Sequence, residues 1–145
     1  MEIYTIGFTK RTAAEFFGAL KRAGIKRLLD VRLNNVSQLA GFTKRDDLPF
    51  FLNEICGAEY VHQPLLAPTQ DILDAYKKKK GSWQEYEKRF LQLMENRKIE
   101  ARIDRGLFVV PTALLCSEAT ADHCHRRLVL DYLKSKWGDL KVVHL

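Results

Sequence analysis

The sequence lacks the features that would place it in a membrane or outside the cell. No apolar stretch approaches the ~20 residues that a membrane-spanning helix needs, and no basic-then-apolar signal segment opens the chain. Cysteine is scarce: three residues, an odd number, argue against a disulfide framework and fit a reducing compartment. We therefore expect a cytoplasmic protein without a membrane partner.

The common nucleotide-binding and nucleophile motifs are also missing. The sequence contains no Gly-x-Gly-x-x-Gly, no Walker-type loop and no Gly-x-Ser-x-Gly. A phosphatase-like Cys-x5-Arg loop is absent because the first arginine after Cys116 is Arg126. These absences leave any cofactor unassigned. Without repeats, low-complexity tracts or linkers, the 145 residues are expected to form one domain, residues 1–145.

The charge balance is moderately basic. Lysine and arginine number 24 against 18 acidic residues, which gives a formal charge of +6 and a pI of about 9.3. Such a charge favours an anionic partner, either a small molecule or nucleic acid, although a basic solvated surface is the simpler interpretation. The strongest local excess, Lys77–Lys80, falls at the end of a predicted helix. Cations suit the helix dipole there, so the run needs no ligand to explain it.

The N-terminal region has the pattern of a β-α-β unit. Residues 2–7 are β-branched and aromatic and end at a glycine. Thr12 and Glu15 form a capping box before a helix with apolar residues at helical spacing, and Gly24 ends that helix. A second strand follows over residues 28–32. Connections this short predict parallel strands with a right-handed crossover.

The rest of the sequence continues this alternation. The predicted elements are a helix over 48–56, a strand over 59–62, helices over 70–79 and 83–98, a strand over 112–116, a helix from Thr120 to about Lys136 and a strand over 140–145. The apolar run that ends at Cys116 does not alternate, which is typical of a central strand buried on both faces. We therefore predict an α/β fold, a three-layer sandwich with a mostly parallel central sheet of about five strands.

Three helix starts and one long connection carry further predictions. Asp47 is the expected cap of the helix over 48–56, Ser82 and Glu85 form a second capping box, and Thr120 caps the last long helix. The connection over residues 33–44 is polar and irregular. Long loops on α/β scaffolds are often functional, so this one is expected to border a site.

Chemically useful side chains follow four of the predicted strands. Parallel strands bring their carboxyl ends to one edge of the sheet, where open α/β proteins bind their ligands. The candidates at these exits are Thr5, Gly7, Thr9, Asp30, Arg32, Asn34, His62, Cys116 and Glu118. We therefore expect residues that are far apart in the sequence to form one polar site.

The segment from Cys116 to Arg127 has the densest chemistry, with two thiols, two imidazoles, two carboxylates and two guanidinium groups. Cys116 is either a catalytic thiol, with its pKa lowered by a helix start and nearby arginines, or the small last residue of a buried strand. Cys124 has apolar residues at i+4 and i+8, which favours a place in the core.

His125 and Arg126 follow directly and lie outside the apolar stripe of the predicted helix. With the free amides of a helix start they could bind phosphate, sulfate or carboxylate, and a solvated helix face is the alternative. Glu118 is expected to pair with Arg32 or Arg126. Asp30 and Arg32 should point to the same face of their strand, either toward a ligand or in an ion-pair network that closes the strand end.

A metal site is not predicted. Suitable ligands occur at Cys116, His123, Cys124 and His125. Their spacing, however, matches no standard zinc pattern. Adjacent residues of a helix also point about 100° apart and seldom bind the same ion.

The same residues resemble a known family. The chain is similar to the DUF488 family over nearly its whole length, in Tyr4-Thr-Ile-Gly7, Leu29-Asp-Val-Arg32, Tyr60-Val-His62, Leu114-Leu-Cys-Ser-Glu118 and Cys124-His-Arg126. The resemblance implies a compact α/β domain with a shared polar site, and it implies no established reaction. The chain departs from the commoner family pattern at Asn35 with Ser37-Gln38, at Leu66-Ala-Pro-Thr69 and at Ala121. The first two departures border the expected site, so the ligand is expected to differ from that of other members.

Our leading hypothesis is a small α/β protein with a polar, phosphate-type anion pocket at the carboxyl edge of the strands, and this pocket favours an enzyme that acts on nucleotide or nucleic-acid substrates. The predicted ligand-binding residues are Arg32, His62, His125 and Arg126, and the catalytic candidates are Cys116 as nucleophile with Glu118 and Asp30 as base or orienting groups. A nucleic-acid-binding module without chemistry is the alternative. A structural protein whose polar residues form only an ion-pair network is the third. The sequence does not predict the oligomeric state.

Overall fold

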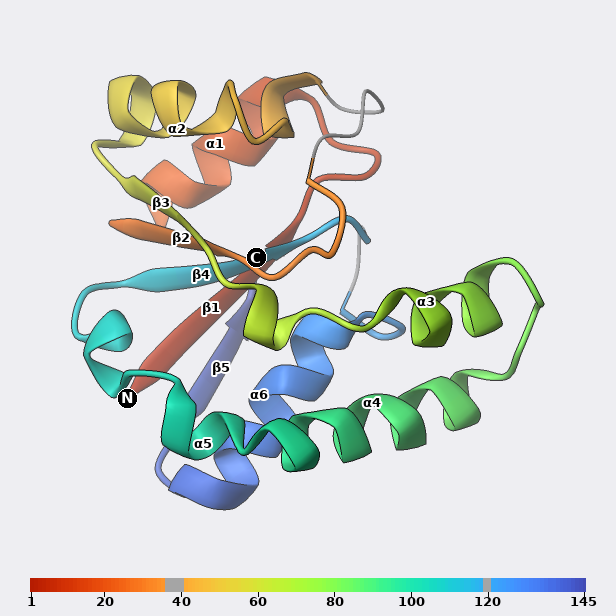
Figure 1. Cartoon of the computed structure of the whole chain (residues 1–145). Coiled ribbons are helices and arrows are strands. Elements are labelled where there is room, and N and C mark those ends of the chain that lie inside the picture. The colour runs from red at the N-terminus through yellow and green to blue at the C-terminus, as the bar shows by residue number, and fades with distance from the viewer. Residues whose placement is uncertain (36–40, 119–120) are drawn as a thin grey trace.

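A parallel sheet is the frame of the molecule. The computed structural model describes residues 1–35, 41–118 and 121–145. The strands within these residues are β1 (Glu2–Gly7), β2 (Arg27–Asp30), β3 (Glu59–His62), β4 (Thr112–Cys116) and β5 (Lys141–His144). They pair in the order β3-β2-β4-β1-β5, and every pair is parallel (Figure 1). The predicted α/β fold with a mostly parallel sheet of about five strands is therefore confirmed.

Helices cover both faces of this sheet, as Figure 1 shows. On one face lie α1 (Ala13–Arg22) and α2 (Leu48–Phe51), which continues as a π-helical turn over Leu52–Cys56. The other face is covered by α3 (Gln70–Lys77), α4 (Trp83–Arg97), α5 (Ile99–Arg102) and α6 (His125–Trp137). Short 3-10 turns occupy Gly41–Thr43, Pro64–Leu66 and Arg105–Phe108. Among the described residues, no helix has both the length and the apolar character needed to cross a bilayer.

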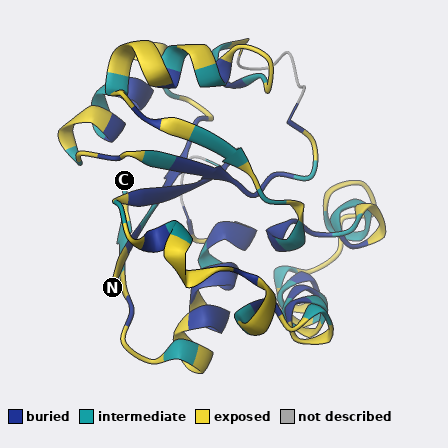
Figure 2. Ribbon diagram, turned by 60° about the vertical axis from the view of Figure 1, so that its left-hand side comes forward, coloured by how far each residue is buried: buried dark blue, intermediate teal, exposed yellow. Residues whose placement is uncertain are grey.

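Each face of the sheet carries its own apolar cluster. Neighbouring residues of β4 point to opposite clusters: Leu114 packs in the cluster that contains Phe90 of α4, and Leu115 in the cluster that contains Phe16 of α1. All of β4 is buried, and Figure 2 shows the buried strands between the helical layers. This position explains why the sequence of β4 does not alternate between apolar and polar residues. Pro111 precedes the strand, and its carbonyl accepts a hydrogen bond from the Lys26 N–H at 2.8 Å.

The predicted helix caps are confirmed only in part. At α1 the Thr12 hydroxyl accepts from the Glu15 N–H at 3.1 Å, and the Thr12 N–H donates to the Glu15 carboxylate at 2.9 Å. At α4 the Ser82 hydroxyl accepts from the Glu85 N–H at 3.1 Å, which is the first of the two expected bonds. The prediction for α2 is wrong, because the Asp47 side chain makes no capping hydrogen bond. Its backbone is already helical, whereas a capping residue is normally extended.

The last long helix starts later than predicted. We expected its start at Thr120, which lies outside the described residues, whereas α6 begins at His125. Cys124 therefore precedes the helix, with extended backbone angles of φ −136° and ψ 140°. It is buried in the apolar cluster next to α6, as predicted, but its side chain does not follow the helical spacing from which that prediction was made. Part of the predicted functional connection, residues 36–40, also lies outside the described residues.

The difference between the two N-terminal caps can be tested by mutation. Thr12→Ala should lower the free energy of unfolding by about 1 kcal/mol, because the Glu15 N–H loses its acceptor. Asp47→Ala should change it by less than about 0.5 kcal/mol, since no capping bond is lost. Urea denaturation of both variants gives the comparison, and equal losses would contradict the difference between the two caps.

Candidate functional site

A cavity of about 380 Å³ lies at the carboxyl edge of the sheet. It is bordered by the ends of β1, β2 and β4, by α3 and α4, and by the start of α6. Of the seven predicted catalytic and ligand-binding residues, four line it, namely Arg32, Cys116, Glu118 and His125, as do the strand-exit residues Thr9 and Asn34. The other three, Asp30, His62 and Arg126, are not among its lining residues. The strand exits therefore meet at one edge, and the predicted set divides into residues that line the cavity and residues outside it.

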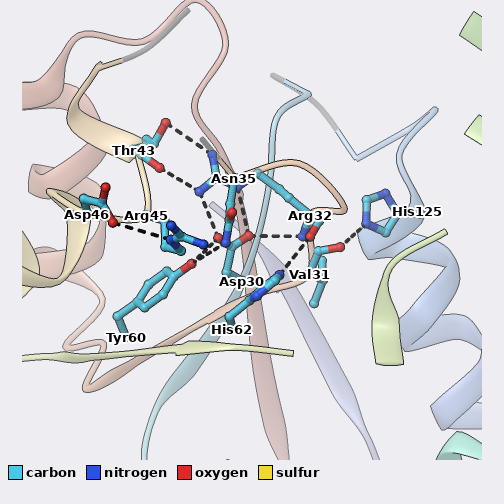
Figure 3. Close-up of polar contacts among 10 residues, drawn as sticks. All are labelled: Asp30, Val31, Arg32, Asn35, Thr43, Arg45, Asp46, Tyr60, His62 and His125. Carbon is cyan, nitrogen blue, oxygen red and sulfur yellow. Dashed lines mark hydrogen bonds and ion pairs between the residues drawn. The ribbon is translucent and has the colours of Figure 1, made fainter. Parts of the chain in front are cut away.

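The floor of the cavity contains a thiol beside an imidazole. The Cys116 Sγ atom lies 3.4 Å from Nδ1 of His125. The other ring nitrogen, Nε2, lies 2.6 Å from the carbonyl oxygen of Val31, which follows β2 (Figure 3). A carbonyl only accepts, so Nε2 carries the proton of this bond and Nδ1 faces the sulfur. His125 is buried, which excludes the solvated helix face considered for it.

The two cysteines at the floor have different acidities. Burial raises the pKa of Cys116, but a hydrogen bond from Cys124, the charge of Arg126 and the backbone N–H groups of Ser117 and Glu118 together lower it below the ordinary value. Burial raises the pKa of Cys124, and the neighbouring Cys116 sulfur raises it further. Of the two thiols, Cys116 is therefore the more readily ionised.

Arg126 lies behind the floor rather than in the cavity. It is 1% exposed, and its donors bond to three separate parts of the chain. Nη1 donates to the Glu118 carbonyl at 2.6 Å and reaches the Cys124 Sγ at 3.8 Å, and Nε donates to the Thr5 hydroxyl at 3.3 Å. The guanidinium group thus joins β1, the segment after β4 and the start of α6. Its charge acts on Cys116 without reaching the cavity.

Gly7, the last residue of β1, makes this contact possible. A Cβ atom at this position would lie 1.5 Å from the Glu118 carbonyl oxygen and 2.7 Å from Nη1 of Arg126. No larger residue fits while the Glu118 carbonyl accepts from Arg126. Gly7, which was expected to end the strand and was named among the strand-exit candidates, therefore permits the close approach of two backbone segments.

Asp30 and Arg32 form a buried network at the end of β2. Nε and Nη2 of Arg32 donate to the two carboxylate oxygens of Asp30, each at 2.9 Å, and Nη2 also donates to the Thr43 carbonyl at 2.7 Å (Figure 3). The Tyr60 hydroxyl donates to Asp30 at 2.5 Å. Burial and this bond raise the pKa of Tyr60 well above its ordinary value, so the hydroxyl remains a donor. The carboxylate of Asp30 therefore binds Arg32 and Tyr60 outside the cavity. Arg32 lines the cavity, but its guanidinium group is already paired with Asp30.

His62 lies at the end of β3, on the exposed side of the same network. Its Nε2 atom lies 3.1 Å from the backbone carbonyl of Arg32, and the residue is exposed (Figure 3). The structure therefore places His62 against the backbone of the segment after β2 and outside the cavity.

Glu118 does not pair with the arginines that were predicted as its partners. Its carboxylate lies 2.6 Å from Nζ of Lys77, at the end of α3, and both side chains line the cavity. Burial lowers the pKa of Lys77, but the ion pair with Glu118 raises it above the ordinary value. The helix end alone therefore does not account for Lys77, which the sequence did not identify as a site residue. Its position in a run of four lysines gave no sign that only one of them faces the cavity.

A wall of aromatic rings was also missed. Trp83, the first residue of α4, stacks on Tyr86 with ring centroids 5.1 Å apart, and on His123 at 4.9 Å. All three residues line the cavity, together with Tyr76. The helical spacing places Trp83 and Tyr86 on the inward side of α4. It could not show that this side borders a cavity at one end of the helix and the core at the other.

The cavity floor also assembles a group of side chains that could bind a metal ion. One ligand atom each from Cys116, Cys124 and His125 lies within 4.8 Å of the others, and all three residues are buried. His123, the fourth ligand type considered from the sequence, stacks on Trp83 and is not part of this group.

Comparison with known proteins identifies one family. The sequence model of a family described as "Domain of unknown function DUF488" matches residues 12–133. No curated protein and no solved structure matches the chain significantly. The matched range contains the predicted catalytic and ligand-binding residues, from Asp30 to Arg126, whereas Thr5, Gly7 and Thr9 precede it.

The close contact at Gly7 gives a test of the site's construction. Gly7→Ala should lower the free energy of unfolding by about 1–3 kcal/mol or more, because the new methyl group displaces the Glu118 carbonyl. The control is Gly18→Ala in α1, where the added Cβ meets only the flexible guanidinium of Arg22, at 3.0 Å. Alanine is favoured over glycine in a helix by about 1 kcal/mol, so this variant should be at least as stable as the wild type. Chemical denaturation compares the two, and a Gly7→Ala protein of wild-type stability would contradict the packing described.

Proposed function

The chain belongs to the DUF488 family, as its resemblance indicated, and because the description of that family assigns no activity, we propose a function from the cavity itself. We propose that the protein binds a small anion that carries an aromatic ring, of the nucleotide class, and acts on it at the sulfur-containing floor. The observation that carries this proposal is the presence in one cavity of a cationic group, flat rings and a paired thiol and imidazole. Each of these three parts supports one feature of the ligand.

Lys77 supports an anionic group on the ligand. Its side chain is about half exposed beside the cavity and is held by Glu118, so a phosphate oxygen could reach the ammonium group without displacing a buried contact. The start of α6 adds the positive end of a helix dipole, since Cys124 and His125 line the cavity. We therefore assign to Lys77 the anion-binding role that the sequence suggested for Arg32 and Arg126, whose donors bond within the protein.

The aromatic wall supports a planar group. Trp83 stacks on His123 and on Tyr86, and this cluster of rings lines the cavity, where a nucleobase could pack against it. A volume of about 380 Å³ lies at the small end of the range for ligand pockets, which suits a mononucleotide or one nucleotide at a chain end.

The floor supports chemistry rather than binding alone. A thiol beside an imidazole that is itself oriented by a third group is the arrangement of an activated nucleophile, and Val31 supplies the orienting carbonyl for His125. Glu118 lines the same cavity and orients Lys77. Asp30 acts only through Arg32, so we assign it a positioning role.

Ligand-induced stabilisation tests this proposal. Adenosine monophosphate should raise the melting temperature of the wild-type protein more than adenosine or inorganic phosphate, because only the nucleotide fills both the ring wall and the cation site. Lys77→Met should abolish the difference between nucleotide and nucleoside. Lys79→Met, an exposed lysine of the same run that does not line the cavity, should leave it unchanged.

The comparison can fail in two ways. If none of the four common nucleoside monophosphates stabilises the wild type, the proposed ligand class is wrong. If Lys79→Met loses as much stabilisation as Lys77→Met, the effect is one of general surface charge and not of the cavity.

A second candidate function is nucleic-acid binding without catalysis. It is favoured by the exposed lysines Lys78, Lys79 and Lys80, which continue from Lys77 beside the cavity. A single strand could place its terminal nucleotide at the aromatic wall and its phosphates along these lysines, a combination typical of single-strand binding sites.

The salt dependence of binding tests this second candidate. The affinity for a short single-stranded oligonucleotide should fall log-linearly between roughly 50 and 200 mM salt. Replacement of Lys78, Lys79 and Lys80 by glutamine should reduce the slope by about 2. Lys134→Gln, near the far end of α6, should not change it. Fluorescence anisotropy measures the affinity of each protein over this range of salt. Binding that is absent or independent of salt would rule this function out.

A further inference from the structure

Two sulfur atoms and one ring nitrogen meet at the floor of the cavity, in Cys116, Cys124 and His125. We propose that these three side chains bind a divalent transition-metal ion, zinc in the first instance, and leave one coordination position open to the cavity. This inference rests on the proposed function for the identity of the ligand that reaches the open position, and it replaces the nucleophilic role proposed there for Cys116.

The spacing of the three atoms suits a tetrahedral ion. Zinc lies about 2.3 Å from thiolate sulfur and about 2.0–2.1 Å from imidazole nitrogen, which places neighbouring ligand atoms about 3.5–3.8 Å apart. The Cys116 Sγ and His125 Nδ1 atoms are 3.4 Å apart. No pair in the group is farther apart than 4.8 Å, so movements of about 1 Å or less bring all three to the tetrahedral spacing.

The orientation of His125 is that of a metal ligand. Histidines that bind metals almost always donate their second ring N–H to a carbonyl or carboxylate, which fixes the ring and directs the free nitrogen to the ion. In His125 the Nε2 atom donates to the Val31 carbonyl at 2.6 Å (Figure 3). The unprotonated Nδ1 atom therefore points to the sulfur of Cys116, where the ion would lie.

A buried positive charge lies next to the sulfur atoms. Nη1 of Arg126 donates to the sulfur of Cys124 at 3.8 Å. Burying two adjacent thiolates is costly unless positive charge compensates them. A divalent ion supplies that charge at the centre of the group, and Arg126 adds to it from behind.

The objection raised by the sequence does not apply to this geometry. Adjacent residues of a helix diverge, but Cys124 lies before α6 in an extended conformation and only His125 is helical. The backbone bend between them allows both side chains to reach the same point beside Cys116. The three ligands therefore come from two chain segments, the end of β4 and the start of α6.

The fourth position faces the cavity. Cys116, Cys124 and His125 all line it, and within the described part of the chain no further cysteine, histidine or acidic residue belongs to the group. Three protein ligands with one open position are characteristic of catalytic zinc sites, whereas structural sites use four. The open position would take a water molecule or an anionic oxygen of the ligand, which the ion would polarise as a Lewis acid. On this proposal the sulfur of Cys116 is a metal ligand and not the nucleophile.

Cobalt substitution tests the proposal on the full-length protein. Chelator-treated protein, kept reduced without added thiols, is titrated with Co²⁺ while its visible and near-ultraviolet absorption is recorded. We expect one equivalent of Co²⁺ to produce thiolate-to-cobalt charge transfer and the intense bands of tetrahedral cobalt, both abolished by Zn²⁺. Cys116→Ser, Cys124→Ser and His125→Asn should each weaken binding by at least ~10-fold. Cys56→Ser is the control, because Cys56 lies away from the cavity with its thiol directed to the Phe17 carbonyl.

The outcomes separate this proposal from the proposed function. A wild-type spectrum without thiolate-to-cobalt charge transfer overturns the metal site. This result does not depend on whether the ligand variants fold. An equal loss in Cys56→Ser also overturns it. Lys77→Met should bind Co²⁺ as the wild type does and yet lose its stabilisation by adenosine monophosphate. Stabilisation by the nucleotide without Co²⁺ binding would leave the cavity function standing, with Cys116 as its nucleophile.

Discussion

A guanidinium group that is buried away from water must find partners for its donors, and Arg126 finds them on segments that meet only in the folded chain. It bonds to the Thr5 hydroxyl in β1 and to the Glu118 carbonyl after β4, and it belongs itself to the first turn of α6. Moving that turn away would leave a buried charge unpaired, at a cost of several kcal/mol. The position of His125 beside Cys116, and with it the floor of the cavity, therefore depends on this one side chain.

Much of the fold follows from local features of the sequence. The first β-α-β unit has its two strands parallel, as expected, with β4 between them, and the capping box of Thr12 and Glu15 starts α1 where expected. The apolar run before Cys116, which does not alternate with polar residues, marks the strand that lies at the centre of the sheet. Because parallel strands share an edge, the convergence of Arg32, Cys116 and Glu118 on one cavity also follows from the order of the elements.

The contacts within the site could not be predicted in the same way. Glu118 had two arginines as plausible partners and pairs instead with Lys77, since the choice depends on where α3 lies and not on any local pattern. The sequence did not indicate that α6 starts at His125. Thr120 is one of the residue types preferred as a helix cap, whereas Cys124, which precedes the helix, is not. Helical spacing likewise placed Trp83 facing inward without showing what it faces.

The cavity is formed by two parts of the chain that contribute different chemical groups. Its floor is carried by the sheet edge and the start of α6, whereas its cation and its ring wall, Lys77 and Trp83, are carried by α3 and α4, which pack side by side and are joined by a short turn (Figure 1). The ion pair between Lys77 and Glu118 links the two parts. Under the proposed function, substitutions in the α3–α4 hairpin would change which molecule is accepted without disturbing the groups at the floor. Selectivity and reactivity could then diverge separately, because they are carried by different segments of the chain.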